Sequence, residues 1–310
     1  MPDHSNQPVL NGVAALTDLG VIQIEGEDAA KFIHGQLTHD FALLGQDTAR
    51  LAAFCNAKGR MQASFIGFKR PDGVILLVCS RDLLAATLKR LSMFVLRAKA
   101  KLRDASDQFQ VFGLAGNATI SGAAHASAAW SKADLDTASL VALYPADGTP
   151  RQLLVAPAGH ATPAGAALSA EQWAWGEVRS GVATLTQPVW EAFVPQMLNY
   201  ESVGGVSFKK GCYPGQEVVA RSQFRGTLKR RGFIAHCLAP AAPGTAVFAH
   251  DDADQPVGMV VQAAAAPLGG WDAIVSLQLA AVQTGTLHLG APGGPVLQLL
   301  PLPYPLLDDI

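Results

Sequence analysis

The chain has 310 residues, of which 49% are hydrophobic and 15% are charged. This length and composition are sufficient for one large hydrophobic core or two smaller ones. The net charge of −2 and a pI near 6.4 argue against a general nucleic-acid binder, because such proteins usually carry a surplus of basic residues.

The first elements predicted along the chain are strands and one short helix. Residues 21–24 alternate like a strand, and Asp28 is a suitable N-cap for a helix whose apolar residues follow at helical spacing. Two further strands, at 51–54 and 61–68, flank the turn-forming residues 56–60. This arrangement predicts a β-hairpin.

The middle of the chain predicts alternating strands and helices around one irregular stretch. Residues 116–148 are rich in Ala, Ser and Asp with weak periodicity, which indicates a variable surface excursion. The other predicted segments, in chain order, are a strand at 73–80, a long amphipathic helix at 81–99, strands at 109–114 and 152–156, and a second helix at 163–180.

After residue 231 the sequence changes to short apolar strands separated by Gly/Pro turns. This pattern predicts a small all-β barrel or sandwich. We therefore expect an α+β region over residues 1–230, with two subdomains, and a β-barrel over residues 231–310. The predicted barrel strands are at residues 232–238, 245–250, 257–262, 273–279, 286–289 and 296–300.

The four cysteines are far apart and form no Cys-x-x-Cys pair. This spacing fits neither a disulfide framework nor a zinc or iron–sulfur ligand set, so we expect a reducing compartment and no metal site. The first residues lack the features of a signal peptide, and no apolar run is long enough to span a bilayer. A cytoplasmic, soluble protein without membrane contact is the expectation.

The segment Lys209-Lys-Gly-Cys-Tyr-Pro-Gly-Gln-Glu217 is the most informative in the sequence. Pro214 suits the first position of a helix, which would put Cys212 just outside a helix N-terminus and beside two lysines. Both surroundings favour a thiolate, so Cys212 has the sequence context of a reactive cysteine. The alternative is a small buried apolar residue in a Gly/Pro turn.

The stretch from Phe193 to Arg231 resembles the YgfZ family of folate-binding proteins. These proteins are relatives of the glycine-cleavage aminomethyltransferase (T-protein) and of the folate-binding domain of a tRNA-modifying GTPase. A second family signature is matched by Phe32-Ile-His-Gly-Gln-Leu-Thr-His-Asp40. Pro214 stands where many relatives have threonine. The other matching residues are Phe193–Gln196, Gly204–Glu217, Val219–Arg221, Phe224–Gly226 and Lys229-Arg230.

The resemblance implies a fold, a cofactor and a cellular role. The fold would be a folate-binding region of two similar α+β halves followed by a C-terminal β-barrel. The cofactor would be tetrahydrofolate, and Cys212 the working thiol. Such proteins act in the assembly or repair of iron–sulfur clusters and thereby affect tRNA modification, so the expected partners are folate and iron–sulfur proteins or their assembly factors.

Folate requires an aromatic wall for its pterin ring and positive charge for its carboxylate tail. The resemblance selects Trp173 over Trp175 as the residue against the pterin, and a core position is the alternative for both. Lys209 or Lys210 would contact the tail or be ordinary surface charges. Glu217 would accept hydrogen bonds from the pterin or only begin a helix, and Arg221 would clamp a carboxylate or only pair with Glu217 one turn earlier.

Two other functions stay open. One is a true aminomethyltransferase that moves a one-carbon unit to folate. The other is a tRNA-binding module that uses the basic segment from Arg225 to Arg231, although direct nucleic-acid binding is not expected from the overall charge. Cys212 has no evident His/Asp partner in the sequence, and His34 and His39 are spaced by five on one predicted helix, so neither hydrolase chemistry nor a metal site is indicated.

Overall fold

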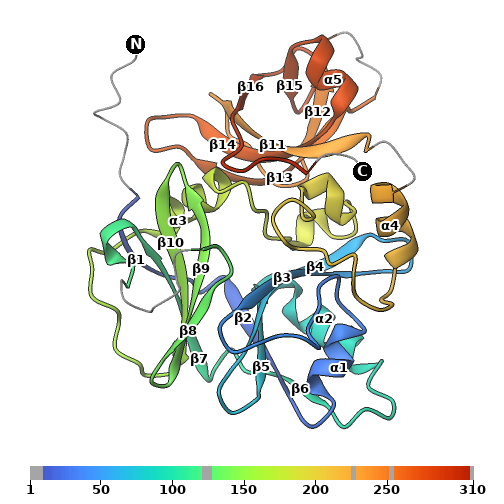
Figure 1. Cartoon of the computed structure of the whole chain (residues 1–310). Coiled ribbons are helices and arrows are strands. Elements are labelled where there is room, and N and C mark those ends of the chain that lie inside the picture. Colours follow the sequence, from blue (N-terminus) through green and yellow to red (C-terminus); the bar gives the residue numbers. More distant parts are fainter. Residues whose placement is uncertain (1–9, 121–127, 225–227, 251–254, 308–310) are drawn as a thin grey trace.

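The computed structural model describes residues 10–120, 128–224, 228–250 and 255–307. The chain forms two five-stranded antiparallel sheets and a closed barrel, which lie around a common centre (Figure 1). This arrangement confirms the predicted α+β class and the C-terminal β-barrel. In the described part of the chain, no helix is both long and apolar enough to cross a membrane.

The first sheet is covered on one face by two helices. Its strand order is β3-β4-β5-β2-β6. Phe32 and Ile33 of the first helix are buried with Phe54 and Phe65 of the sheet. The apolar residues that recur at helical spacing in the sequence therefore form the face of the helix that packs on the sheet. The elements are β2 (Leu19–Glu25), α1 (Ala29–His34), β3 (Ala49–Cys55), β4 (Met61–Lys69), β5 (Ile75–Ser80), α2 (Arg81–Ser92) and β6 (Lys101–Asp104).

The second sheet has the order β1-β7-β10-β9-β8 and packs against the first. One cluster of buried residues contains Val21 and Val78 from the first sheet and Val141 and Val155 from the second, so the two halves share a core. The elements are β1 (Gly12–Ala15), β7 (Phe109–Ala115), η2 (Gly116–Ala118), β8 (Lys132–Leu135), β9 (Ala138–Ala146), β10 (Thr149–Pro157) and α3 (Ala170–Arg179).

The connecting region and the barrel complete the chain. The barrel closes in the order β11-β14-β13-β12-β15-β16, and Ile234 and Ile274 belong to the same buried cluster as Leu51 and Met61 of the first sheet. The separation into two domains near residue 230 stays a prediction. The elements are η3 (Gln187–Val189), η4 (Pro195–Leu198), α4 (Gln216–Phe224), β11 (Arg230–Cys237), β12 (Ala246–Ala249), β13 (Gly258–Ala265), β14 (Trp271–Gln278), α5 (Leu279–Thr284), β15 (Leu287–Leu289) and β16 (Val296–Leu300).

The predicted surface excursion at 116–148 is wrong in its main part. It contains β8 and β9, and β9 lies between β10 and β8 with most of its residues buried. A strand that is buried on both faces does not alternate between apolar and polar residues, so its period is lost in the sequence. Residues 121–127 of this stretch lie outside the described part of the chain.

Both long helices were predicted too long. The helix predicted at 81–99 ends at Ser92, and the helix predicted at 163–180 begins only at Ala170. Ser169 and Gln172 form a capping box that fixes this start. Asp28 does occupy the position before α1, but its carboxylate accepts a hydrogen bond from the Lys99 backbone N–H instead of capping the helix.

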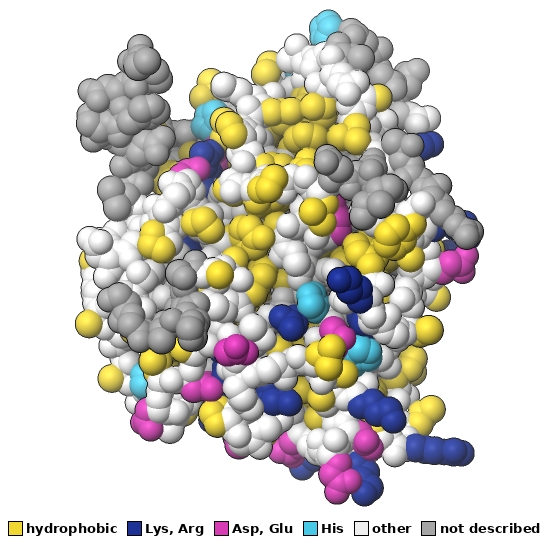
Figure 2. Space-filling model, in the orientation of Figure 1, with side chains coloured by type: hydrophobic (Ala, Val, Ile, Leu, Met, Phe, Trp, Pro, Cys, Tyr) yellow, Lys and Arg dark blue, Asp and Glu magenta, His cyan; other side chains and the backbone are white. Residues whose placement is uncertain are grey.

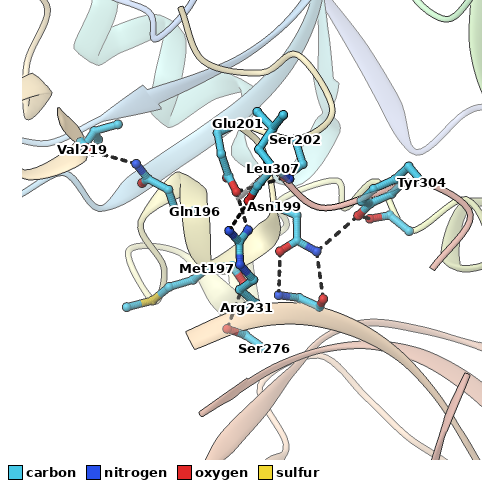
Figure 3. Close-up of polar contacts among 12 residues, drawn as sticks. Gln196, Met197, Asn199, Glu201, Ser202, Val219, Arg231, Ser276, Tyr304 and Leu307 are labelled. Atoms are coloured by element: carbon cyan, nitrogen blue, oxygen red, sulfur yellow. Dashed lines mark hydrogen bonds and ion pairs between the residues drawn. The ribbon is translucent and has the colours of Figure 1, made fainter. Parts of the chain in front are cut away.

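A buried polar network joins the barrel to the segment after η4 (Figure 3). The Asn199 amide pairs with the backbone of Gly232 on β11, donating to its carbonyl at 2.8 Å and accepting from its N–H at 3.1 Å. Arg231 forms an ion pair with Glu201 at 2.5 Å and donates to the Leu307 carbonyl at 2.8 Å. Burial raises the pKa of Glu201, and Arg231 opposes that shift.

We expect Arg231→Met to destabilise the fold strongly, because it leaves the fully buried Glu201 carboxylate without its cation. Breaking a buried ion pair costs about 3–5 kcal/mol, which urea unfolding at pH 7 would measure. The penalty should shrink as the pH falls, since a protonated Glu201 needs no cation. Arg221→Met is the control, because its pair with Glu217 is exposed and its loss should cost at most about 0.5 kcal/mol. Equal losses in both variants would contradict this.

Candidate functional site: a central cavity and a thiol loop

A narrow cavity of about 50 Å³ lies between the two sheets and α3. Apolar residues such as Leu51 and Ile66 form one side of it. Among the other lining residues are two tryptophans, a tyrosine and two charged side chains, which are Trp130, Trp173, Tyr144, Arg151 and Glu177. Hydrophobic side chains run along the middle of the face shown in Figure 2, and basic, acidic and histidine side chains lie together just below them.

Trp173 is buried and lines this cavity. Its ring rests on β7 at Gly113, where a Cβ would lie 2.6 Å from the indole, so only glycine leaves room for it. Trp175, two residues further along α3, lies outside the cavity and donates its indole N–H to Asp272 at 2.8 Å. The family resemblance predicts Trp173 as the residue against the pterin. Of the two tryptophans, only Trp173 lines the central cavity.

The buried Arg151 forms an ion pair with the partly buried Glu177 beside Trp173. The guanidinium carbon of Arg151 lies 4.4 Å from the centre of a Trp173 ring, and its Nη2 bonds to Glu177. Burial lowers the pKa of Arg151 to about 9. Within the described residues its Nε has no hydrogen-bond partner. Neither residue is predicted as a site residue from the sequence, since a single Arg near the start of a strand and a Glu on a helix carry no signal of their own.

Thr38 joins the two segments that carry the family resemblance. Its hydroxyl donates to the Gly205 carbonyl at 2.7 Å and accepts from the Ala53 N–H at 2.8 Å. Its own carbonyl accepts from the Ser207 N–H at 2.9 Å. The segment after α1 is therefore held between β3 and the loop that leads to Cys212.

Lys210 is buried and attaches the same loop to the end of α1. Its ammonium donates to the carbonyl of His34 at 2.5 Å and to that of Leu37 at 2.7 Å, and it lies 4.5 Å from the centre of the Tyr213 ring. The His34 carbonyl is that of the last residue of α1, where a cation is favourable, and Leu37 lies in the segment that follows the helix. Burial lowers the pKa of Lys210 to about 8, although Asp40 and Cys212 oppose the shift.

Cys212 is exposed, whereas Cys55, Cys79 and Cys237 are buried. The expected helix does follow it, but α4 begins only at Gln216. A turn at residues 213–216, in which the Gln216 N–H donates to the Tyr213 carbonyl, separates the thiol from the helix start. Pro214 therefore precedes the helix and does not occupy its first position.

Gly215 explains why this turn is so compact. Its φ of +80° is in the left-handed region, and a Cβ there would lie 2.4 Å from the Asn56 carbonyl oxygen and 2.7 Å from Gly59. The loop thus lies directly on the β3–β4 hairpin turn. Only glycine permits both the backbone conformation and the approach.

The other predicted ligands around Cys212 are at the surface. Lys209 is exposed, and Glu217 and Arg221 form an exposed i,i+4 ion pair at 2.5 Å. None of these three residues, nor Lys210 or Cys212, lines the central cavity. The structure therefore puts Trp173 in one place and the remaining five predicted site residues in another.

The basic run from Lys209 to Arg231 is not one solvated surface. Lys210 and Arg231 are buried. Lys210 bonds to a backbone carbonyl, and Arg231 forms an ion pair with Glu201. Arg230 is partly buried, and burial together with the nearby Arg60 lowers its pKa. Lys209, Arg221 and Lys229 are exposed, and Arg225 lies outside the described residues.

Two histidines and an aspartate lie beside the thiol loop. His34 Nδ1 and Asp40 Oδ1 are 3.1 Å apart, and a Cβ on Gly211 would lie 3.7 Å from His34 Nε2. His39 accepts a hydrogen bond from the Asp40 N–H at 2.7 Å. Burial and the nearby Arg50 lower the pKa of His39 to about 4, so it is neutral at pH 7.

We expect Lys210→Met to destabilise the protein by about 2 kcal/mol, because it removes a charged donor from two carbonyls. The neighbouring Lys209→Met is the matched control, since an exposed side chain without such bonds should change stability by at most about 0.5 kcal/mol. Urea unfolding of both variants measures the difference. Indistinguishable midpoints would show that the Lys210 bonds contribute nothing to the fold.

The sequence is similar to that of known proteins over most of its length. No protein-family model matches the chain. It is 33% identical over 247 residues to the tRNA-modifying protein YgfZ of Edwardsiella ictaluri (strain 93-146), which covers 74% of this chain and 72% of that protein. The tRNA-modifying protein YgfZ of Sodalis glossinidius (strain morsitans) is 31% identical over 316 residues, covering 94% and 92%.

A solved structure has the same fold. The glycine cleavage system aminomethyltransferase T from Bartonella henselae superposes with a TM-score of 0.65, covering 94% of this chain and 86% of that one, at 15% identity. This likeness confirms the predicted T-protein-like fold. Because the sequence identity to the YgfZ proteins exceeds 30% over most of both chains, the protein belongs to the family of the tRNA-modifying protein YgfZ.

Proposed function

We propose that this protein binds tetrahydrofolate in its central cavity and uses the Cys212 thiol in the assembly or repair of iron–sulfur clusters, and thereby in tRNA modification. Its place of action would be the cytoplasm, and its partners iron–sulfur proteins or their assembly factors. The observation that carries the proposal is the exposed Cys212 at the point where the two family segments are hydrogen-bonded together.

The central cavity offers what a pterin requires. Trp173 supplies an aromatic surface, and Arg151 and Glu177 supply a donor and an acceptor side by side. The edge of a pterin carries a carbonyl acceptor next to N–H donors, so an arginine and a carboxylate together can satisfy it. The unpartnered Nε of Arg151 is a further donor for such a ligand.

Binding would require the cavity to widen. Its volume of about 50 Å³ is below the roughly 300–1,000 Å³ of typical small-molecule sites. The Arg151 guanidinium lies over Trp173, so a pterin on that face would displace it from the ring. Of the two predicted tail ligands, Lys209 is the one whose side chain is exposed, since the Lys210 ammonium is bonded to the backbone carbonyls of His34 and Leu37.

The thiol would act outside the cavity, on a substrate presented at the surface. A deprotonated, accessible sulfur is sufficient for chemistry on sulfur, on iron or on a one-carbon unit. The three buried cysteines are unsuited to that role, because burial raises the pKa of Cys55 to about 12 and also raises the pKa of Cys79 and of Cys237.

Trp173→Leu should weaken the binding of reduced folate by about 3- to 10-fold, because an aromatic stacking contact contributes about 0.5–1.5 kcal/mol. Trp175→Leu is the matched control on the same helix, and we expect no change in affinity there. Isothermal titration calorimetry with tetrahydrofolate measures both. An unchanged affinity in Trp173→Leu would assign Trp173 to the core alone.

Cys212→Ser should abolish complementation of a strain that lacks its own YgfZ protein, with the fold intact because the side chain is exposed. Cys237→Ser is the control, since a hydroxyl can keep the 3.0 Å bond that its thiol donates to the Ala239 carbonyl. Activity of an iron–sulfur enzyme in the strain is the measurement. Normal activity with Cys212→Ser would refute the thiol role.

The aminomethyltransferase alternative has a direct assay. Purified protein would be incubated with an aminomethyl-lipoyl carrier and tetrahydrofolate, and methylene-tetrahydrofolate would be measured. We expect none above background, and steady production would replace the proposed function with that of a transferase.

A further inference from the structure

We propose that the surface around Cys212 binds an acidic protein surface, that of the iron–sulfur partner on which the thiol acts. The inference rests on the proposed function and adds to it the face that receives the partner and the charge that the partner carries. This docking face is centred on the β3–β4 turn at residues 56–60 and includes the thiol loop, α4 and residues 190–192.

Three segments that are distant in the sequence meet at the β3–β4 turn. A Cβ on Gly59 would lie 3.0 Å from the Val218 side chain, so α4 and the end of the hairpin lie side by side (Figure 1). The thiol loop contacts the same turn through Gly215. The Arg60 guanidinium, at the end of the turn, donates to the Ala192 carbonyl at 2.6 Å.

Cys212 lies within the area that one protein partner would cover. It precedes Gly215 by three residues, so their Cα atoms are at most about 11 Å apart. A standard interface covers about 800 Å² of each partner, which is a patch roughly 30 Å across. A protein that binds over the β3–β4 turn therefore also reaches the exposed Cys212.

The docking face carries five cations, and the ion pairs among the described residues use other side chains. Lys58, Lys209 and Lys229 are exposed. Arg60 and Arg230 are close enough that Arg60, in addition to burial, lowers the pKa of Arg230. Two neighbouring guanidinium groups repel each other, and a carboxylate from a partner would relieve that repulsion.

The acids beside the docking face are already bonded within the protein. Glu217 pairs with Arg221, Glu191 accepts from the Gln62 amide at 2.6 Å, and Asp40 is bonded to a histidine. Among the described residues the docking face is therefore net positive, although the whole chain has a net charge of −2. An acidic partner would be steered to this side of the molecule.

Exposed apolar side chains favour a protein over a nucleic acid as the occupant. Val218 is 36% exposed, Trp190 44% and Phe224 50%, and the Phe224 ring packs edge-on against Phe208 with 5.2 Å between centres. Aromatic residues and arginines are enriched at protein interfaces. A long nucleic acid would also meet the net negative charge of the rest of the chain.

The first test is protection of Cys212 from alkylation by iodoacetamide, a neutral reagent, in the full-length protein. Poly-L-glutamate should slow the alkylation about threefold or more at low ionic strength, where the field is least screened, and poly-L-lysine should not. Lys58→Glu combined with Lys229→Glu should abolish the protection, each rate being compared with that of the same variant without the polymer. Lys89→Glu combined with Arg90→Glu is the matched control, because both side chains are exposed on α2.

Absence of protection in the wild type, or its equal loss in the α2 control, would overturn the proposal. Transfer RNA that protects Cys212 more strongly than poly-L-glutamate at equal charge would also overturn it, because the occupant would then be a nucleic acid.

The second test is complementation of the strain that lacks its own YgfZ protein. Lys58→Glu combined with Lys229→Glu should lower the activity of the iron–sulfur enzyme about tenfold, with the Tm unchanged, and the α2 control should be normal. If the double variant does not fold, Lys58→Gln and Lys229→Gln are measured instead. Normal activity in folded variants would reject the docking face alone, whereas normal activity in Cys212→Ser would reject the proposed function.

Discussion

The position of the thiol loop depends on one buried ammonium group. Lys210 bonds to the carbonyl of His34, the last residue of α1, and to that of Leu37 in the segment after it, and these two bonds offset part of the cost of its desolvation. The Thr38 hydroxyl bonds both to Ala53 of β3 and to Gly205. Together with the Lys210 bonds, it holds two segments that are far apart in the sequence side by side. Cys212 then extends from a fixed base and not from a free loop.

The barrel fixes the other end of the same connection. The Asn199 side-chain amide forms two hydrogen bonds with the backbone of Gly232. The buried Glu201–Arg231 ion pair joins the neighbouring residues of the same two segments. Cys212 itself lies between Lys210, which bonds to the His34 carbonyl, and Gly215, which lies on the β3–β4 hairpin turn. An exposed cysteine on a doubly anchored segment loses little conformational entropy when it meets a partner.

The sequence was sufficient for the fold class, the barrel and the exposed cysteine, because each depends on local signals. Gly/Pro turns at short intervals identify barrel strands, and the residues around Cys212 form an uninterrupted motif. It was insufficient for β9, whose burial on both faces removes the alternation that marks a strand. The sequence was also insufficient to show which of two neighbouring lysines is buried. Lys209 and Lys210 are of the same type, and only Lys210 is buried.

The polar parts of both sites were hidden for the same reason. Arg151 meets Glu177 across a sheet–helix contact, and Lys210 bonds to the His34 carbonyl at the end of α1. Both are contacts between residues distant in the sequence, and single side chains of common types carry no periodicity that could reveal them.

The cavity and the thiol loop meet at β3. Successive residues of a strand point to opposite faces, and Leu51 lines the cavity whereas Arg50 lies against the Asp40 carbonyl at 3.4 Å. β3 is an edge strand of its sheet, and its free side is bonded to Thr38 through Ala53. β3 therefore lines the cavity with one residue and supports the segment after α1 with its neighbours. The cavity and the thiol loop consequently share one strand, although none of the predicted site residues of the thiol loop lines the cavity.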